Sequence, residues 1–403
     1  LFTNNTLRDT YNTAGGDMRG MSVKGSFNGT IYDNNIFNNT YGIRGGYGTS
    51  EIPHSWYMNY TNNYIYNNSY GATLSLHNMT TFENNKIYDN LEYGLWQWSG
   101  NNTNVTNNTF YNSNGAAPVM DYGIRIDTSF YNIIKYNYFI NFSGSSDQGI
   151  RLNNDNCDYN IIENNSFIEN LYPIWNQGGD YNNMSYNNFS STVSASRGIT
   201  TDESGGAKEN FFINNKFTTT TEVGSTYGYY LRYCHNCTVL DHDIADAHDY
   251  ALYIRNTDNV NVTNFTSHDA ASYNIYANSA NGTFDQLRLS LSSYGMALLS
   301  SEGTLVKNSV INGTSYGLLI YTNSNNSRIV DSFLYAPTYG VRELSGTGAS
   351  KKNTLLNTTY NNNVYYTSGG TGVIEFQQYL DVRVNTTLGE GIQNANVTVF
   401  NTS

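Results

Sequence analysis

The sequence predicts an all-β solenoid, a coil of about 14 stacked turns made of short strands. A similar segment recurs with a period of roughly 21–30 residues, the range that stacked-repeat folds use. Each copy ends in Tyr-Gly and an alternating run, as in TNNYIYNNSYGATL from Thr61 and KNSVINGTSYGLLI from Lys307. The alternation in YGIRID at 122–127 indicates a strand with one buried face. No segment shows a sustained helical apolar period, so we expect two or three short strands per turn, buried only by stacking on neighbouring turns.

The composition argues against two classes of protein. Only 13% of the 403 residues are charged and the net charge is −12, whereas a nucleic-acid binder needs a basic surface. Disordered chains lack aromatic residues, yet 15% of this chain is aromatic. No apolar stretch approaches the roughly 20 residues that span a bilayer. Because no signal peptide precedes Leu1, we expect a processed part of a longer chain, whose missing part could hold a membrane anchor.

Asparagines recur at a fixed offset of about two residues before an apolar residue in successive turns. A side-chain amide both donates and accepts, and equivalent positions of stacked parallel strands lie about 4.8 Å apart. We therefore predict a hydrogen-bonded ladder of Asn63, Asn85, Asn108, Asn137, Asn165, Asn215 and Asn308, with Asp331 as a variant. The alternative is that these are ordinary loop asparagines, which tolerate left-handed bends.

The pattern of two asparagines, an apolar pair and Tyr-Gly, seen in full or in part in NNSFIENLYPI at 164–174 and NNTF at 107–110, resembles the repeats of right-handed parallel β-helix proteins. The resemblance implies that residues 1–372 form one right-handed parallel β-helix. It says little about activity, because such repeats occur in polysaccharide lyases, hydrolases, epimerases, phage tailspikes and surface proteins.

Residues 373–403 differ from the repeats, because they alternate strongly and then turn at Gly389-Glu390-Gly391. They look like the first strands of an immunoglobulin-like domain, an order similar to that of large archaeal and bacterial cell-surface proteins. An isolated pair of strands is only marginally stable, so the alternative is a C-terminal cap on the coil.

The N-x-Ser/Thr sequon for N-glycosylation occurs about 23 times. An Asn-rich and Thr-rich chain produces some sequons by chance, and they matter only in an exported protein. We expect glycans among Asn4, Asn28, Asn38, Asn59, Asn67, Asn78, Asn101, Asn104, Asn141, Asn183, Asn188, Asn236, Asn261, Asn264, Asn281, Asn312, Asn325, Asn357, Asn385 and Asn396. The sequons at Asn107 and Asn164 adjoin the predicted ladder, where we expect partial enclosure.

The three cysteines leave several alternatives open. Cys234, His235 and Cys237 could contribute to a metal site, but a tetrahedral site needs four ligands and the fourth is not evident. A short disulfide between Cys234 and Cys237 is a second alternative, and free thiols, including Cys157, are a third. We assign no metal and no cofactor, and leave structural calcium open.

Residues at every second position after Tyr-Gly are predicted to point outward from one sheet. The resulting face is expected to contact a carbohydrate or a protein partner, since exposed aromatic and arginine residues favour contacts. Its predicted members are Trp96, Trp98, Arg125, Asp127, Arg151, Asn153, Trp175, Tyr230, Tyr253 and Tyr276. The alternative is a face covered by a long loop or by glycans.

The sequence offers no complete acid/base set, so we assign no catalytic residue. The outward carboxylates Asp127 and Asp202 are three turns apart, roughly 14 Å, which is too far for hydrolysis. The run LDHDIADAHDY at 240–250 faintly resembles the Asp-His-Asp element of mannuronan epimerases but lacks that family's surrounding residues. Within it, His242 falls at the ladder position, where a structural role suffices.

We therefore expect a glycosylated, extracellular, structural or adhesive protein of a microbial, in particular archaeal, cell surface. It would be a subunit of a filament, sheath or surface layer that assembles with identical copies. The alternative is a carbohydrate-active β-helix protein, either a lyase or epimerase or a glycan-binding adhesin.

Overall fold

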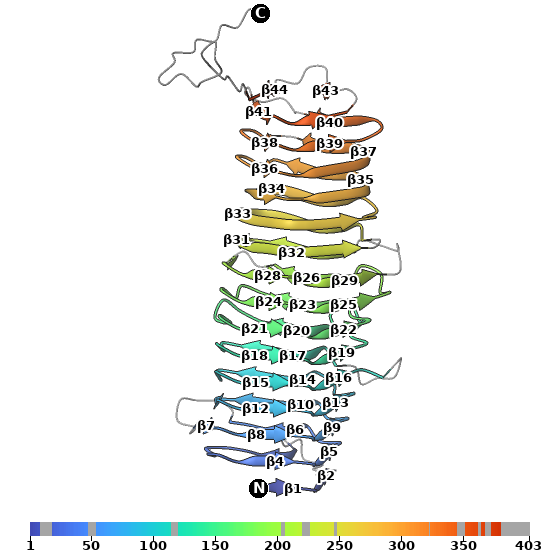
Figure 1. The fold of residues 1–403 in the computed structure, drawn as a ribbon. Helices are drawn as coiled ribbons and strands as arrows, with labels where there is room; N and C mark the ends of the chain where they lie inside the picture. The colour runs from blue at the N-terminus through green and yellow to red at the C-terminus, as the bar shows by residue number, and fades with distance from the viewer. Residues whose placement is uncertain are drawn as a thin grey trace, which may run out of the picture.

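The protein is a parallel β-solenoid of about 14 turns, as the computed structural model shows (Figure 1). The structure describes residues 1–8, 18–46, 54–113, 120–202, 206–219, 226–245, 248–321, 323–344, 351–361, 364–366 and 372–379. Within these residues every strand pairing is parallel and no helix occurs, which confirms the predicted fold class. Each turn passes through three sheet faces, which we call B, C and A in chain order.

Face A is formed by the strands that begin at the Tyr-Gly motif or at the equivalent position of turns that lack it. They are β3 (Arg19–Ser22), β6 (Tyr41–Arg44), β10 (Tyr70–Ser75), β14 (Tyr93–Trp98), β17 (Tyr122–Asp127), β20 (Gln148–Leu152), β23 (Tyr172–Asn176), β26 (Arg197–Thr201), β30 (Tyr227–Arg232), β40 (Tyr339–Leu344) and β43 (Val364–Tyr366). Four longer strands also run through this face, namely β33 (Tyr250–His268), β34 (Tyr273–Asp285), β35 (Arg288–Leu299) and β37 (Val310–Tyr321).

Face B consists mainly of three-residue strands. They are β1 (Phe2–Thr3), β4 (Thr30–Tyr32), β8 (Asn59–Thr61), β12 (Thr81–Glu83), β15 (Asn104–Thr106), β18 (Ile133–Lys135), β21 (Ile161–Glu163), β24 (Asn183–Ser185), β28 (Phe211–Ile213), β36 (Leu305–Lys307), β38 (Arg328–Val330), β41 (Lys351–Leu356) and β44 (Gly372–Gln377). Parts of β33, β34 and β32 (Thr238–Ala245) complete it.

Face C follows face B after a tight corner. Its strands are β2 (Thr6–Arg8), β5 (Asn35–Phe37), β9 (Tyr64–Tyr66), β13 (Lys86–Tyr88), β16 (Thr109–Tyr111), β19 (Tyr138–Ile140), β22 (Ser166–Ile168), β25 (Asn188–Ser191), β29 (Lys216–Thr219), β39 (Phe333–Tyr335) and β42 (Thr359–Tyr360), with parts of β32, β33, β35 and β37. Two side pairs lie between faces A and B, β7 (Ser55–Trp56) with β11 (His77–Asn78) and β27 (Ala207–Lys208) with β31 (Cys234–His235).

A column of buried asparagines joins the turns at the corner between faces B and C. Asn63 donates its side-chain amide to Asn85 Oδ1 at 3.0 Å, and Asn85 donates to Asn108 Oδ1 at the same distance. The same bond links Asn108, Asn137, Asn165, Asn187 and Asn215 in succession. Each asparagine also accepts the backbone N–H of its predecessor, as Asn137 Oδ1 does from Asn108, so each amide satisfies several otherwise buried groups.

The predicted ladder is wrong at its end. Asn308 is exposed, has a left-handed backbone with φ 51°, and donates to Asp285. The buried position belongs to the next residue, Ser309, whose hydroxyl accepts the backbone N–H of Leu287. Asp331 is likewise exposed beside the buried Ser332. Each corner holds an outer left-handed residue and then a buried one, so a lone asparagine can occupy either position.

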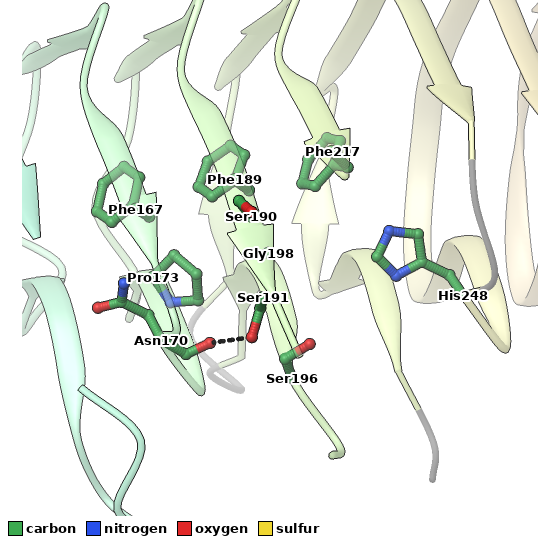
Figure 2. A pocket seen from close by; sticks show the side chains of 10 residues that line it. All are labelled: Phe167, Asn170, Pro173, Phe189, Ser190, Ser191, Ser196, Gly198, Phe217 and His248. Atoms are coloured by element: carbon green, nitrogen blue, oxygen red, sulfur yellow. Dashed lines mark hydrogen bonds between the residues drawn. The ribbon is translucent and has the colours of Figure 1, made fainter. Parts of the chain in front are cut away.

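The interior is filled by columns of apolar side chains, one per strand and turn. On face C, Phe110, Phe139, Phe167, Phe189 and Phe217 stack with centroid distances of 4.7–5.1 Å. Near its end, Asn170, Ser191, Ser196 and His248 line a residual cavity of about 10 Å³, shown in Figure 2, so the packing leaves almost no empty space.

The glycine of the Tyr-Gly motif lies where a side chain would crowd the next turn, although Pro173, Ala251 and Asn274 occupy the equivalent position in three turns. A Cβ added at Gly123 would lie 2.6 Å from the carbonyl oxygen of Gly149 and 2.8 Å from Cδ1 of Phe139. The same contact recurs at Gly42, Gly71 and Gly94. The repeating glycine therefore reflects the spacing between turns rather than a turn conformation.

The strand β44 continues the solenoid, because it pairs with β41 in parallel from Lys351↔Gly372 to Leu356↔Gln377. The expected immunoglobulin-like domain at 373–403 lies almost wholly outside the described residues, which end at Tyr379.

Candidate functional site: the outer surface of face A

The outer surface of face A carries three columns of side chains. Register pairs Trp96 with Arg125, Arg125 with Arg151, and Arg151 with Trp175 in one column. Trp98 pairs with Asp127 in a second column, which Asn153 and Gln177 extend. The tyrosines of Tyr-Gly form the third, in which Tyr93 pairs with Tyr122. The residues predicted to form the contact face therefore lie next to one another on the turns that contain β14, β17, β20 and β23.

Asp127 is the centre of this cluster. Its Oδ2 accepts hydrogen bonds from the Trp96 indole N–H and from Arg125 Nε, the latter at 2.8 Å. Its Oδ1 accepts a bond from Asn153 Nδ2. The Asp127 side chain is only 8% exposed, so these donors replace the water that a carboxylate would otherwise bind. Residues from three successive turns are held in one arrangement by a single carboxylate.

Arg125 is fixed on both sides. Burial alone would lower the pKa of its guanidinium, but the hydrogen bond and charge of Asp127 outweigh burial and the pKa is raised. Nη1 also donates to the Tyr93 hydroxyl at 3.1 Å, and the guanidinium lies 5.5 Å from the Tyr93 ring centroid and 5.9 Å from that of Trp96. Arg125 is therefore a rigid cation whose charge Asp127 neutralises.

Within the part of the chain that the structure describes, Arg151 on the next turn forms no ion pair with a carboxylate. Its guanidinium donates to the Tyr122 hydroxyl at 3.0 Å and to the side-chain oxygen of Gln177. The rings of Tyr122 and Trp175 lie 5.5 and 5.7 Å from it. Its Nε is shielded from solvent and meets no acceptor among the described residues. A positive charge held among neutral groups is suited to an anionic ligand.

Trp96 and Trp98 form a pair of nearly parallel rings. Their centroids are 6.1 Å apart with 14° between the ring planes, and Tyr93 adds a third ring 5.3 Å from Trp96. Both tryptophans remain partly exposed. The result is a small aromatic platform beside two arginines.

The tyrosines of Tyr-Gly are part of the site, which sequence reasoning missed. Tyr70, Tyr93 and Tyr122 stack with centroid distances of 5.6 and 5.3 Å, and the hydroxyls of Tyr93 and Tyr122 bind the two arginines. The glycine and the residue after it both face inward, which breaks the alternation and turns the tyrosine outward. The repetition of tyrosine before glycine is the sequence signal that could have identified these residues.

Further along face A the predicted residues form a different surface. Tyr230 is buried, with 9% exposure, because Arg197 covers its ring at 4.2 Å and Tyr253 stacks on it at 5.0 Å. It offers no open ring to a ligand. The residue that follows Tyr276 in this column is Ala297, whose side chain is small. An uncharged hollow of about 230 Å³ lies beside it, lined by Tyr273, Tyr276, Tyr294, Ala297, Leu299, Leu319, Tyr321 and Leu344.

His242 and the three cysteines, which lie outside face A, make contacts that stabilise the fold. His242 is buried and bonds to the Tyr229 hydroxyl and to the Phe212 carbonyl, and burial lowers its pKa to about 4. Cys234 and Cys237 form a disulfide, whereas Cys157 is a buried free thiol. Among the described residues, no three His, Cys, Asp or Glu side chains are placed to hold a metal ion.

Two carboxylates on face A have separate partners. Asp127 binds Arg125, and Asp202 binds Arg232 at 2.8 Å three turns further along. The sequon asparagines Asn107 and Asn164 are exposed rather than partly enclosed, because each occupies the outer left-handed position of its corner. Asn78 is buried, with 7% exposure, and its amide lies 3.1 Å from His54 Nδ1.

Comparison with known proteins identifies the repeat. The family model described as right-handed beta helix region matches residues 1–110, 51–226 and 227–387. None of the curated proteins matches the chain significantly. No described helix is long and apolar enough to cross a membrane.

Several solved structures are similar to this chain at low identity. PfbA, a surface adhesin of Streptococcus pneumoniae, is 8% identical with a TM-score of 0.42, over 85% of this chain and 88% of that one. A tailspike protein mutant of E. coli bacteriophage HK620 in complex with pentasaccharide is 9% identical with a TM-score of 0.44, over 93% and 70%. The catalytic domain of a GH87 alpha-1,3-glucanase in complex with tetrasaccharides is 15% identical with a TM-score of 0.35, over 86% and 63%.

Proposed function

We propose that this chain, which belongs to the right-handed β-helix family, is an extracellular surface protein that binds a carbohydrate through face A. The observation that carries this proposal is the Asp127 network, which fixes Trp96, Arg125 and Asn153 beside the Trp96/Trp98 ring pair. Preorganised polar groups next to an aromatic surface are the usual composition of a small-ligand site.

The favoured ligand is a saccharide that carries a carboxylate or another anionic group. The chain as a whole has a net charge of −12, so it does not attract anions in general. Arg151 is nevertheless a cation between Tyr122 and Trp175 that pairs with no carboxylate of the described residues. A planar guanidinium binds a carboxylate through paired hydrogen bonds, and the nearby rings can cover an apolar sugar face.

A glycan array, followed by titration calorimetry on the strongest ligand, tests this function. We expect binding to acidic oligosaccharides that falls at least tenfold in Arg151→Gln and in Trp96→Ala. Arg328→Gln, which alters a cation on face B, is the matched control and should bind as the native protein does. Failure of native protein to bind any acidic or neutral glycan, or equal binding by all variants, would overturn the proposal.

Contact with another copy of this chain is a second candidate, favoured by the uncharged hollow around Ala297, Leu319 and Leu344. Such contact would make the protein a subunit of a filament, sheath or surface layer. Light scattering over a hundredfold concentration range tests it. We expect association that Leu319→Asp abolishes, whereas a monomer at every concentration would exclude this candidate.

A further inference from the structure

The N-x-Ser/Thr sequons are distributed unevenly around the solenoid. On the strands of faces B and C they occur at Asn59, Asn104, Asn183, Asn188, Asn261 and Asn312. Those at the B–C and C–A corners are Asn4, Asn38, Asn67, Asn107, Asn141, Asn164, Asn264 and Asn357, and those on the side between faces A and B are Asn28, Asn78, Asn101, Asn236, Asn281 and Asn325. Asn385 and Asn396 lie outside the described residues.

Within the described strands of face A there is no sequon asparagine. Asparagine itself is not excluded from this face, because Asn153 and Asn278 both point outward, but neither has Ser or Thr two residues later. The outward asparagines of face A therefore lie outside the three-residue signal.

The residue types that the corners favour do not explain all of the sequons. At Asn67 and Asn164 the sequon combines an exposed left-handed asparagine with the buried asparagine that follows, so structure alone could favour the first two residues. At Asn59, Asn104, Asn188 and Asn261, however, the asparagine is an exposed strand residue with neither role. Asparagine is a poor strand former, which makes these positions costly without another use.

We infer that N-linked glycans coat faces B and C, the corners and the side between faces A and B, and that face A is kept bare as the contact face. This inference rests on the proposed function of face A and adds a modification pattern to it. A glycan is bulky and strongly hydrated, so one glycan on face A would shield the side chains of adjacent turns, about 4.8 Å apart. The same glycan on face C points away from the ligand.

The test places a glycan on each face in turn. Asp155→Thr completes a sequon at Asn153 on face A, and Phe37→Thr completes one at Asn35 on face C. Both are produced in a host that attaches N-glycans and in one that does not. We expect the glycosylated Asp155→Thr protein to lose at least tenfold in binding to the acidic oligosaccharide, and the unglycosylated form and both forms of Phe37→Thr to bind like the native protein.

Mass spectrometry of native glycopeptides is the second readout. We expect glycans at exposed positions such as Asn59, Asn104 and Asn261 and an unmodified Asn78, which is buried. Native material without N-glycans, or loss of binding from the face C glycan as well, would overturn the inference while leaving the proposed function intact. Absence of binding by unmodified native protein would instead reject the proposed function.

Discussion

The indole N–H of Trp96 donates a hydrogen bond to Asp127, which lies one turn further along face A and in the neighbouring column. This bond fixes the plane of the partly exposed Trp96 ring through the nearly buried Asp127 carboxylate. Asp127→Ala should therefore weaken ligand binding at least tenfold and lower the free energy of unfolding by about 2 kcal/mol, because Arg125 and Asn153 lose their acceptor.

Calorimetry and chemical denaturation measure the two effects. Asp202→Ala provides the control, since it removes a comparable partner of Arg232 three turns away. It should leave binding unchanged. Equal loss of binding in both variants would show that Asp127 acts only through general stability.

The asparagine ladder should contribute strongly to stability. Asn137→Ala removes a buried amide that bonds to Asn108, Asn165 and the carbonyl of Val105, so we expect a loss of at least about 3 kcal/mol by urea denaturation. Asn308→Ala changes an exposed corner residue and should cost only about 1 kcal/mol, mainly because alanine is strained in the left-handed backbone at φ 51°. Similar losses in the two variants would contradict the assignment of the buried position to Ser309.

At Gly123, an added side chain should be destabilising. Gly123→Ala places a Cβ 2.6 Å from the Gly149 carbonyl oxygen, so the two turns must separate, at a cost of about 2 kcal/mol. Gly303→Ala is the comparison, since a Cβ there meets no atom within 4 Å and only the positive φ of 70° opposes it. Thermal denaturation should rank Gly123→Ala as the less stable variant, and the reverse order would contradict close contact as the cause.

Three buried histidines should make the fold sensitive to mild acid. Burial lowers the pKa of His77, His242 and His248 to about 4, whereas the unfolded value is about 6.5. Below about pH 6.5 the unfolded chain binds protons that the folded chain does not, so stability is lost as the pH falls toward 4. Each histidine contributes up to about 3 kcal/mol to this loss.

His242→Asn isolates one of these contributions. Asp147, whose pKa burial raises to about 6, acts in the opposite direction over part of the same range, so the variant is more informative than the slope for native protein. The drop in unfolding free energy between pH 7 and pH 5 should be about 2 kcal/mol smaller in His242→Asn. An unchanged drop would show that His242 is not neutral in the folded state.

The repeated features were predictable from sequence because each column requires the same residue in many turns. Asn63 through Asn215 and the inward residues after Tyr-Gly repeat often enough to fix the register. Features that occur only once along the solenoid could not be predicted from the repeat. The hydrogen bonds of Asp127 join three turns, and the burial of Tyr230 depends on Arg197 from the preceding turn. Asn308 was wrongly predicted as a buried ladder residue because its corner has a single asparagine, and that asparagine occupies the exposed position.

The hydrogen bonds between turns all run along the solenoid axis, as do the amide bonds of the asparagine ladder. A force that pulls the two ends apart therefore loads successive interfaces in series and detaches one turn at a time. A force across the axis strains the covalent backbone of many turns at once. The molecule should therefore be weaker against tension along its length than against forces directed across its axis, because only the latter load the covalent backbone directly.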